Sequence, residues 1–275
     1  MLLALLPLAA AGIALSGGGS SRGILPQQAL SELQRTGYVV LPNFLSAEEV
    51  EDCVGDVAQL CASGRFSSAG VGEAALNRVD EGVRRCEQCF IFPKGRQRGA
   101  GVGEVREQLF SKIDALRSAL HENCGKPLDA LLTEGLYVYY PHGGYYKRHL
   151  DAATGTTSAL RVWSYLLYLN QAWSEEDGGW LRIFNDGGAE SAPEGGPPSY
   201  VDVEPRGGTL VVFRSDSVPH EVLETRAERL ALVGWLCQPL EGSSTRRSLI
   251  AGLSAALAVG SAIKFGPSLF GGQAK

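Results

Sequence analysis

Cysteine is scarce in this sequence, which contains six cysteines among 275 residues. That number is too small for a disulfide scaffold in a chain of this length. Cys86 and Cys89 form one C-x-x-C motif in RRCEQCF, but no second pair follows at zinc-like spacing, so simple thiols are favoured over a metal or redox role. Cys53 and Cys61 fall on or beside the apolar face of a predicted helix, which indicates small core residues.

The sequence also lacks an excess of positive charge, because its formal net charge is −5. Without a basic field to hold phosphate groups, nucleic acid is not expected as a main partner. The hydrophobic content of 44% and charged content of 20% are typical of a globular protein and argue against wholesale disorder. The length suffices for a sizeable core in one large domain or two small ones.

The amino end is apolar but has no basic residue in front of its apolar run. Residues 1–23 read MLLALLPLAAAGIALSGGGSSRG, an apolar stretch followed by a Gly/Ser linker. This pattern predicts a signal or targeting segment, leading to the secretory pathway or an organelle. A short anchor or a misassigned start are the alternatives.

The carboxyl end, residues 241–275, forms a predicted hydrophobic tail. Its apolar stretch from Leu249 to Ile263 is shorter than the ~20 residues that a membrane-spanning helix needs. It is nevertheless too apolar for an ordinary solvated tail. Two interpretations remain, membrane or interface association and a helix packed on the body of the protein.

Glycine and proline are plentiful, with 35 and 13 residues, and their turns favour β structure over a helical bundle. Residues 24–130 are predicted as a helical support region. PQQALSELQRTG indicates a helix that ends at Gly37, and YVVLPNFL a first strand. Ser46 and Glu49 form a capping box before a second helix. A loop-rich stretch follows, with a short hairpin expected around Phe90, and then an amphipathic helix ending near His121, which we interpret as structural.

Residues 131–240 change to a period of two and are predicted as the β core. Short strands are expected at VWSYLLYL, WLRIF, YVDVE, TLVVF and LALVGWL, separated by Gly, Pro and Asp turns. Many short strands after a helical lead-in predict an α+β, mainly β fold, a jelly roll buttressed by helices. No internal repeat is evident.

The stretch YYPHGGYYKRHLDA carries the first candidate site. His149 and Asp151 are one residue apart, so on an extended backbone both side chains project to the same face. Imidazole and carboxylate suit Fe(II), and a third ligand would complete a facial triad. The sequence has four histidines, and His220, which follows the apolar strand TLVVF, is the natural third ligand. An H-x-D pair alone is weak evidence.

Arg229 supplies the context that the H-x-D pair needs. It lies nine residues after His220 and shares one face of a predicted strand with Ala231, Val233 and Trp235. An arginine on an apolar strand face is costly unless an anion pairs with it. An exposed strand end is the alternative interpretation. A carboxylate cosubstrate held between the metal and this guanidinium would explain both features.

The order H-x-D, distal His, then Arg resembles the Fe(II)/2-oxoglutarate dioxygenases. YPHGGYYKRHLDA, YLLYLN, DGGWLRIF, VPHEV and ERLALVGW are similar to the prolyl 4-hydroxylase branch that includes the EGL-nine (hypoxia-inducible factor) enzymes. The similarity covers roughly Gly37 to Gln238. It implies a double-stranded β-helix of the jelly-roll, cupin-like kind.

The resemblance also implies roles for individual residues, position by position. The iron ligands would be His149, Asp151 and His220. The 2-oxoglutarate site would contain Arg229, Tyr168, Tyr140 and Trp235. Arg161 matches an arginine that contacts the substrate chain, and His142 would be a turn residue near the entrance. Val233 departs from the animal enzymes, which have a threonine there, and the loop between Asp151 and Tyr168 is longer than theirs.

The implied activity is hydroxylation of a prolyl residue in a protein, using Fe(II), 2-oxoglutarate and O2 and releasing succinate and CO2. Dependence on L-ascorbate is typical of the family. The alternatives are a dioxygenase acting on another side chain or on a small molecule, and a membrane-tethered binding module without turnover. A secretory start would suit lumenal targets, whereas the motifs are most similar to intracellular enzymes, so the compartment stays open.

Overall fold

A computed structural model describes residues 23–70, 79–92, 97–185 and 199–240. Within these ranges the helices are α1 (Gln27–Thr36), α2 (Ala47–Ala62) and α3 (Gly103–Asn123), and short 3-10 turns follow α3 at Ala130–Leu132, Thr157–Leu160 and Glu175–Asp177. The strands are β1 (Tyr38–Leu41), β2 (Ser67–Ser68), β3 (Arg84–Arg85), β4 (Glu87–Phe90), β5 (Glu134–Tyr140), β6 (Tyr145–His149), β7 (Arg161–Tyr168), β8 (Leu181–Phe184), β9 (Tyr200–Val203), β10 (Leu210–Arg214), β11 (His220–Val222) and β12 (Arg229–Cys237).

The end of α1 and the start of α2 lie where the sequence predicts. Gly37 adopts a positive φ of 83° after α1, and its N–H donates to the carbonyl of Leu33. The capping box of α2 is present, because Ser46 Oγ accepts from the Glu49 N–H while the Glu49 carboxylate accepts from the Ser46 N–H. These local signals fix the end of α1 and the start of α2.

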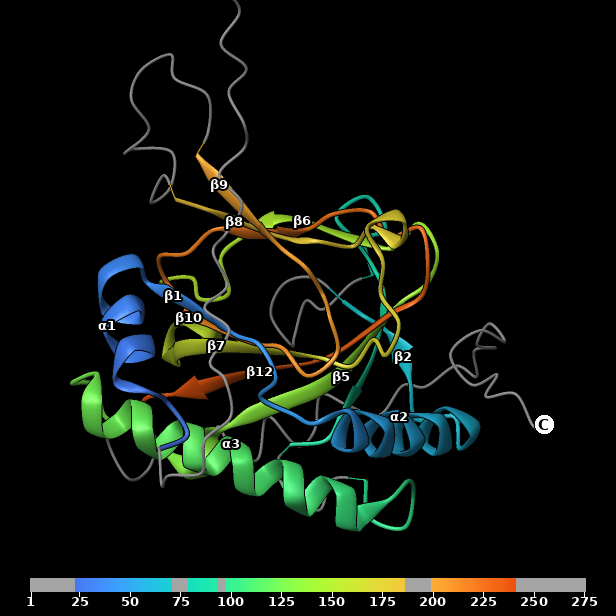
Figure 1. Cartoon of the computed structure of the whole chain (residues 1–275), viewed down its shortest axis with the longest axis horizontal. Coiled ribbons are helices and arrows are strands. Elements are labelled where there is room, and N and C mark those ends of the chain that lie inside the picture. Colours follow the sequence, from blue (N-terminus) through green and yellow to red (C-terminus); the bar gives the residue numbers. More distant parts are fainter. Residues whose placement is uncertain (1–22, 71–78, 93–96, 186–198, 241–275) are drawn as a thin grey trace, which may run out of the picture.

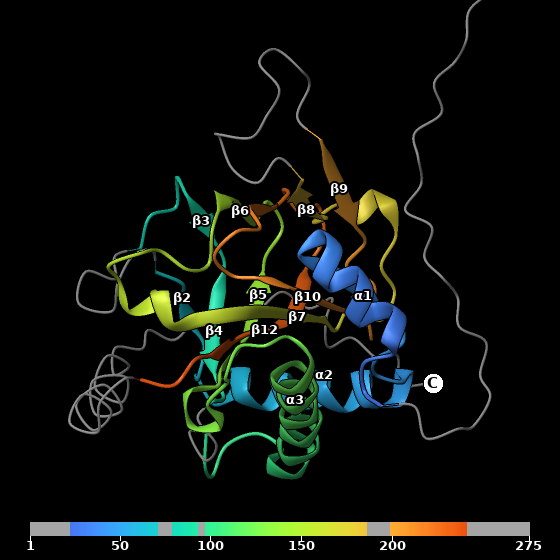
Figure 2. The same ribbon diagram turned by 90° about the vertical axis from the view of Figure 1, so that its left-hand side faces the viewer.

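The strands form two antiparallel sheets that face each other in a jelly roll (Figure 1). The larger sheet has the order β1-β10-β7-β12-β5-β4-β2, and the smaller one β3-β6-β11-β8-β9. The helices lie against the side of the larger sheet that faces away from the smaller sheet, as Figure 2 shows for α2 and α3. The mainly β, helix-buttressed jelly roll predicted from the sequence is confirmed. Residues 24–130 provide strands of both sheets as well as the helices.

The larger sheet separates two hydrophobic clusters, and the period of two in the sequence divides its residues between them. Along β5, Leu136, Val138 and Tyr140 enter the cluster between the two sheets. Tyr137 and Tyr139 point the other way and pack in the cluster under the helices. The space between the sheets is therefore lined by one set of alternate residues, and the candidate site lies there.

Two expectations about residues 62–103 are revised. Phe90 does not lie in a local hairpin, because β4 pairs with the distant β5 and with β2. The C-x-x-C motif overlaps β4, so its two side chains lie on opposite sides of the sheet. Cys86 packs between the sheets and Cys89 under the helices. All six thiols are free, and the side chains of Cys86 and Cys89 point away from each other.

The predicted N-terminal targeting segment and the C-terminal tail lie outside the described residues. Among the residues that the structure does describe, none of the helices combines the length and apolar character needed to cross a membrane.

Candidate metal and cosubstrate site

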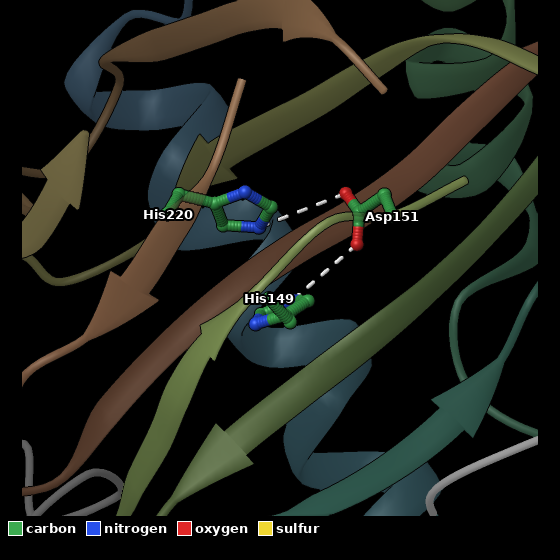
Figure 3. Close-up of side chains that lie close together, drawn as sticks. All are labelled: His149, Asp151 and His220. Carbon is green, nitrogen blue, oxygen red and sulfur yellow. Dashed lines mark ion pairs between the residues drawn. The ribbon is translucent and has the colours of Figure 1, made fainter. Parts of the chain in front are cut away.

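The structure brings His149, Asp151 and His220 together at one end of the space between the sheets (Figure 3). His149 ends β6 and lies directly opposite His220, the first residue of β11, in the antiparallel pairing. Asp151 follows two residues later, where the chain crosses to the larger sheet. The Ser215 carbonyl holds this crossing in place by accepting from the N–H groups of Asp151 and Ala152 at 3.1 and 3.0 Å.

One potential ligand atom from each of the three side chains lies within 4.8 Å of the others. Nε2 of His149 is 3.4 Å from Asp151 Oδ1, and Nε2 of His220 is 3.7 Å from Asp151 Oδ2. The Nδ1 atom of each imidazole lies within hydrogen-bond distance of a backbone carbonyl, that of Lys147 at 2.7 Å and that of Val218 at 3.1 Å. Donation from Nδ1 leaves both Nε2 lone pairs directed at the same point, as a metal ion requires.

The protonation states suit a cation. Burial would raise the pKa of Asp151, but the imidazoles of His220 and His149 and the Ser164 hydroxyl hold it well below its usual range. Burial, together with the neighbouring His149, lowers the pKa of His220 to about 4. At neutral pH the group therefore presents an ionised carboxylate and a neutral imidazole with a free lone pair.

Two buried hydroxyls fix the orientation of the carboxylate, and sequence reasoning missed both. The Ser164 hydroxyl, on β7, donates to Asp151 Oδ2 at 2.7 Å, and Ser215 Oγ lies 2.9 Å from Ser164 Oγ. Neither serine is exposed to solvent. Because Ser164 donates to Asp151, Ser215 must be the donor to Ser164. This relay leaves Asp151 Oδ1 as the oxygen without a hydroxyl partner.

We expect Ser164→Ala to weaken Fe(II) binding roughly 10- to 100-fold, the range seen when an outer-sphere partner of a metal ligand is removed. Anaerobic calorimetry with Fe(II) measures this effect. Ser111→Ala is the matched control, because that hydroxyl bonds the Glu107 carbonyl on the exposed face of α3. Equal Fe(II) affinity in Ser164→Ala and wild type would show that the relay does not orient Asp151.

Arg229 is the second feature of the site. It begins β12, is 1% exposed, and donates from Nε to the Gly179 carbonyl at 2.9 Å. Its Nη1 and Nη2 atoms are buried and have no hydrogen-bond partner among the described residues. A buried guanidinium without a counter-ion is expensive, so this arrangement calls for an anion.

Aromatic side chains form the walls around this guanidinium. Arg229 lies 4.9 Å from the ring centre of Tyr140 and 5.1 Å from that of Tyr168. The Tyr168 hydroxyl is also buried without a hydrogen-bond partner in the described part of the chain. Burial, partly offset by Arg229, raises the pKa of Tyr168 to about 12, so the hydroxyl remains a donor. Trp235 Nε1 is a third buried donor without a partner in this part of the chain.

These unpaired donors fit a carboxylate. The terminal nitrogens of Arg229 and the Tyr168 hydroxyl can together receive the distal carboxylate of 2-oxoglutarate, as the resemblance implies. Val233, where animal enzymes have a threonine, packs against the same apolar cluster and supplies no donor. The site thus places three potential metal ligands near buried donors that have no partner among the described residues.

Arg161 begins β7, in the same sheet as Arg229, and its guanidinium already has partners within the fold. It donates to both carboxylate oxygens of Glu134, at 3.4 and 2.9 Å, and to the Asp151 carbonyl at 3.2 Å. Its guanidinium also stacks 3.6 Å from the ring centre of Trp235. The substrate contact predicted for Arg161 stays a prediction.

The two remaining histidines are not in the metal group. His142 is exposed in the turn after β5. His121, near the end of α3, accepts from the Leu128 N–H at 3.0 Å through Nδ1. This bond ties the end of α3 to the segment that follows it, which is a structural role.

A jelly roll with a His-Asp-His group and a buried arginine at one end defines a class, the metal-dependent oxygenases that take a keto-acid cosubstrate. Comparison with known proteins narrows this class to one superfamily. Residues 135–237 match the 2OG-Fe(II) oxygenase superfamily. The chain belongs to this superfamily, and its branch is the prolyl 4-hydroxylase-like one. Fe(II) and 2-oxoglutarate are therefore the expected metal and cosubstrate.

Three relatives support that branch. A prolyl-4-hydroxylase of Pseudomonas putida is 30% identical, with a TM-score of 0.62 and coverage of 78% of this chain and 98% of that one. A Trichoplax adhaerens prolyl hydroxylase, solved with a hypoxia-inducible factor peptide fragment, is 26% identical, with a TM-score of 0.62 and coverage of 80% and 90%. The hypoxia-inducible factor prolyl hydroxylase of Caenorhabditis elegans is 23% identical over 215 residues. These are 77% of this chain and 28% of the relative.

Proposed function

We propose that this protein hydroxylates a prolyl residue in a protein or peptide, consuming 2-oxoglutarate and O2 and releasing succinate and CO2. The observation that carries the proposal is the pairing of the His149–Asp151–His220 group with the unpaired donors of Arg229 and Tyr168. A metal-binding protein without turnover would have no need for that second group of donors. The similarity to prolyl hydroxylases, one of them solved with a peptide fragment, supports the substrate class.

Each part of the site has a distinct task under this proposal. His149, Asp151 and His220 hold the metal through three ligands, leaving positions for the keto acid and O2. Arg229 and Tyr168 bind the distal carboxylate and so orient the keto acid toward the metal. Tyr140 and Trp235 exclude water from the reacting centre. When bound, Fe(II) and 2-oxoglutarate supply the oxidative chemistry, which no side chain provides.

Ascorbate dependence and the compartment belong to the proposal as well. Ascorbate would keep the metal ferrous between turnovers, as is typical of the family. Targeting to the secretory pathway or an organelle, and membrane association, rest on the terminal segments, which lie outside the described residues.

Mass spectrometry tests the reaction and separates it from its rivals. The full chain is incubated with Fe(II), 2-oxoglutarate, ascorbate and ¹⁸O₂ in the presence of peptides from a proteolysed cell extract. The proposal expects a gain of one ¹⁸O atom on proline. Labelling of another side chain would indicate a different hydroxylase. Succinate formation without any labelled peptide would favour a small-molecule substrate, and its absence in metal-loaded protein would favour a binding role.

A further inference from the structure

A single backbone carbonyl holds the Arg229 guanidinium. Arg229 Nε donates to the Gly179 carbonyl at 2.9 Å, which is the hydrogen bond recorded for this side chain within the described residues. Gly178 and Gly179 adopt positive φ values of 64° and 71° in the turn before β8. A Cβ atom on Gly179 would lie 2.9 Å from Arg229 Cδ. The turn is thus packed directly against Arg229, and the position of the turn decides where the guanidinium points.

Thr225 packs against the same turn, in the segment that precedes β12. It is 1% exposed, and the Cβ position of Gly179 is 3.2 Å from Thr225 Cβ. The Thr225 hydroxyl lies 3.3 Å from the Asp177 carbonyl and also contacts the Ala227 carbonyl. A hydroxyl has one hydrogen to donate, so these two carbonyls share it. The hydroxyl therefore connects the start of the glycine turn to the residue two positions before Arg229.

Backbone bonds anchor Thr225 on two sides. Its N–H donates to the Gly144 carbonyl at 2.9 Å, and its carbonyl accepts from the Gly143 N–H at 2.7 Å. These glycines belong to the turn that follows Tyr140, an aromatic wall of the cosubstrate site. On the other side, Thr225 pairs with Gly178 in an antiparallel bridge. Because its backbone is anchored in this way, Thr225 has a fixed position from which its hydroxyl can hold the glycine turn.

We propose that Thr225 is a positioning residue for the cosubstrate. Its hydroxyl holds the turn that carries Gly179 against the start of β12, and the Gly179 carbonyl in turn orients Arg229. Both Nη atoms of Arg229 then stay free beside Tyr168 to bind a carboxylate. This inference rests on the proposed function, because it takes 2-oxoglutarate to be the anion that Arg229 binds.

Anaerobic calorimetry with 2-oxoglutarate on the Fe(II)-loaded protein tests this inference in Thr225→Val and Thr225→Ser. Valine keeps the branched shape and removes the hydroxyl, whereas serine keeps the hydroxyl. We expect Thr225→Val to bind 2-oxoglutarate about tenfold more weakly than wild type, as for the loss of one hydrogen bond. Thr225→Ser should bind it nearly as tightly as wild type. Fe(II) affinity measured without 2-oxoglutarate should be the same in all three proteins, because Thr225 is not part of the metal group.

Thr36→Val is the matched control. The Thr36 hydroxyl also bonds two backbone carbonyls, those of Glu32 at 2.9 Å and Tyr38 at 2.7 Å, but it does so at the end of α1. Its loss should lower the Tm about as much as Thr225→Val does and leave 2-oxoglutarate affinity unchanged. Thr225→Ala removes the same hydroxyl as Thr225→Val, and it gives the same comparison with Thr225→Ser if the valine variant does not fold.

Arg229→Met, measured beside these variants, separates this inference from the proposed function. If Arg229→Met loses 2-oxoglutarate affinity while Thr225→Val keeps it, Thr225 has no positioning role and the proposed function stands. The same conclusion follows if Thr36→Val weakens cosubstrate binding equally, or if Thr225→Val weakens Fe(II) binding to the same extent. Wild-type affinity in Arg229→Met would place the cosubstrate carboxylate elsewhere, which would overturn the role of Arg229 and that of Thr225 with it.

Discussion

Replacement of Asp151 by alanine is expected to abolish measurable Fe(II) binding. Asp151 is the one carboxylate of the metal group, and it lies between the two imidazoles, 3.4 Å from His149 Nε2 and 3.7 Å from His220 Nε2. Without its negative charge, the two imidazoles would have to hold a divalent cation alone. The loss should exceed the roughly 10- to 100-fold effect of an outer-sphere change. Anaerobic equilibrium dialysis of Fe(II) against each variant measures it.

Asp202→Ala is the control for this experiment. Asp202 pairs with Arg182 on the smaller sheet through bonds of 2.8 Å and is not part of the metal group. The Asp202→Ala variant should therefore bind Fe(II) like wild type. If Asp151→Ala bound Fe(II) as tightly as Asp202→Ala, the His-Asp-His assignment would be wrong.

Arg229→Met is expected to have opposite effects on cosubstrate binding and on stability. Removal of the buried guanidinium should weaken 2-oxoglutarate binding about 100-fold or more, within the 2–5 kcal/mol typical of a truncated buried charge pair. The unliganded protein should be as stable as wild type or more so. In wild type, folding buries Nη1 and Nη2 without partners among the described residues, whereas methionine buries no charge.

Thermal unfolding with and without 2-oxoglutarate, in the presence of the metal, measures both effects. The cosubstrate should raise the wild-type Tm by mass action and leave that of Arg229→Met nearly unchanged at the same concentration. Arg226→Met is the comparison, because Arg226 is exposed and bonds the backbone carbonyls of Glu175 and Glu176. An equal rise of Tm in Arg229→Met and wild type would place the cosubstrate carboxylate elsewhere.

The parts of the fold set by local patterns could be predicted from the sequence. Glycine gave the end of α1 and the capping box the start of α2, and the pattern of short apolar runs located β5, β7, β8, β9, β10 and β12. The pairing of β4 with β5 could not be predicted, because it joins Phe90 to Leu136. Packing of the whole fold determines which distant strands pair, and a local sequence pattern carries no information about it.

The residues of the candidate site likewise include some that the sequence predicted and some that it did not. His149, Asp151, His220 and Arg229 were found because their spacing and their residue types are unusual for the strands that carry them. The Ser164–Ser215 relay was missed. The two serines are 51 positions apart and meet because β7 pairs with β10.

Anaerobic titration of the metal-free protein with Fe(II) and 2-oxoglutarate tests the central claim most directly. The account predicts a visible metal-to-ligand charge-transfer band that requires both additions, disappears in Asp151→Ala and weakens in Arg229→Met. Such a band reports a keto acid chelated to ferrous iron, without any assumption about the substrate. No band in folded, Fe(II)-loaded wild-type protein would contradict the oxygenase site.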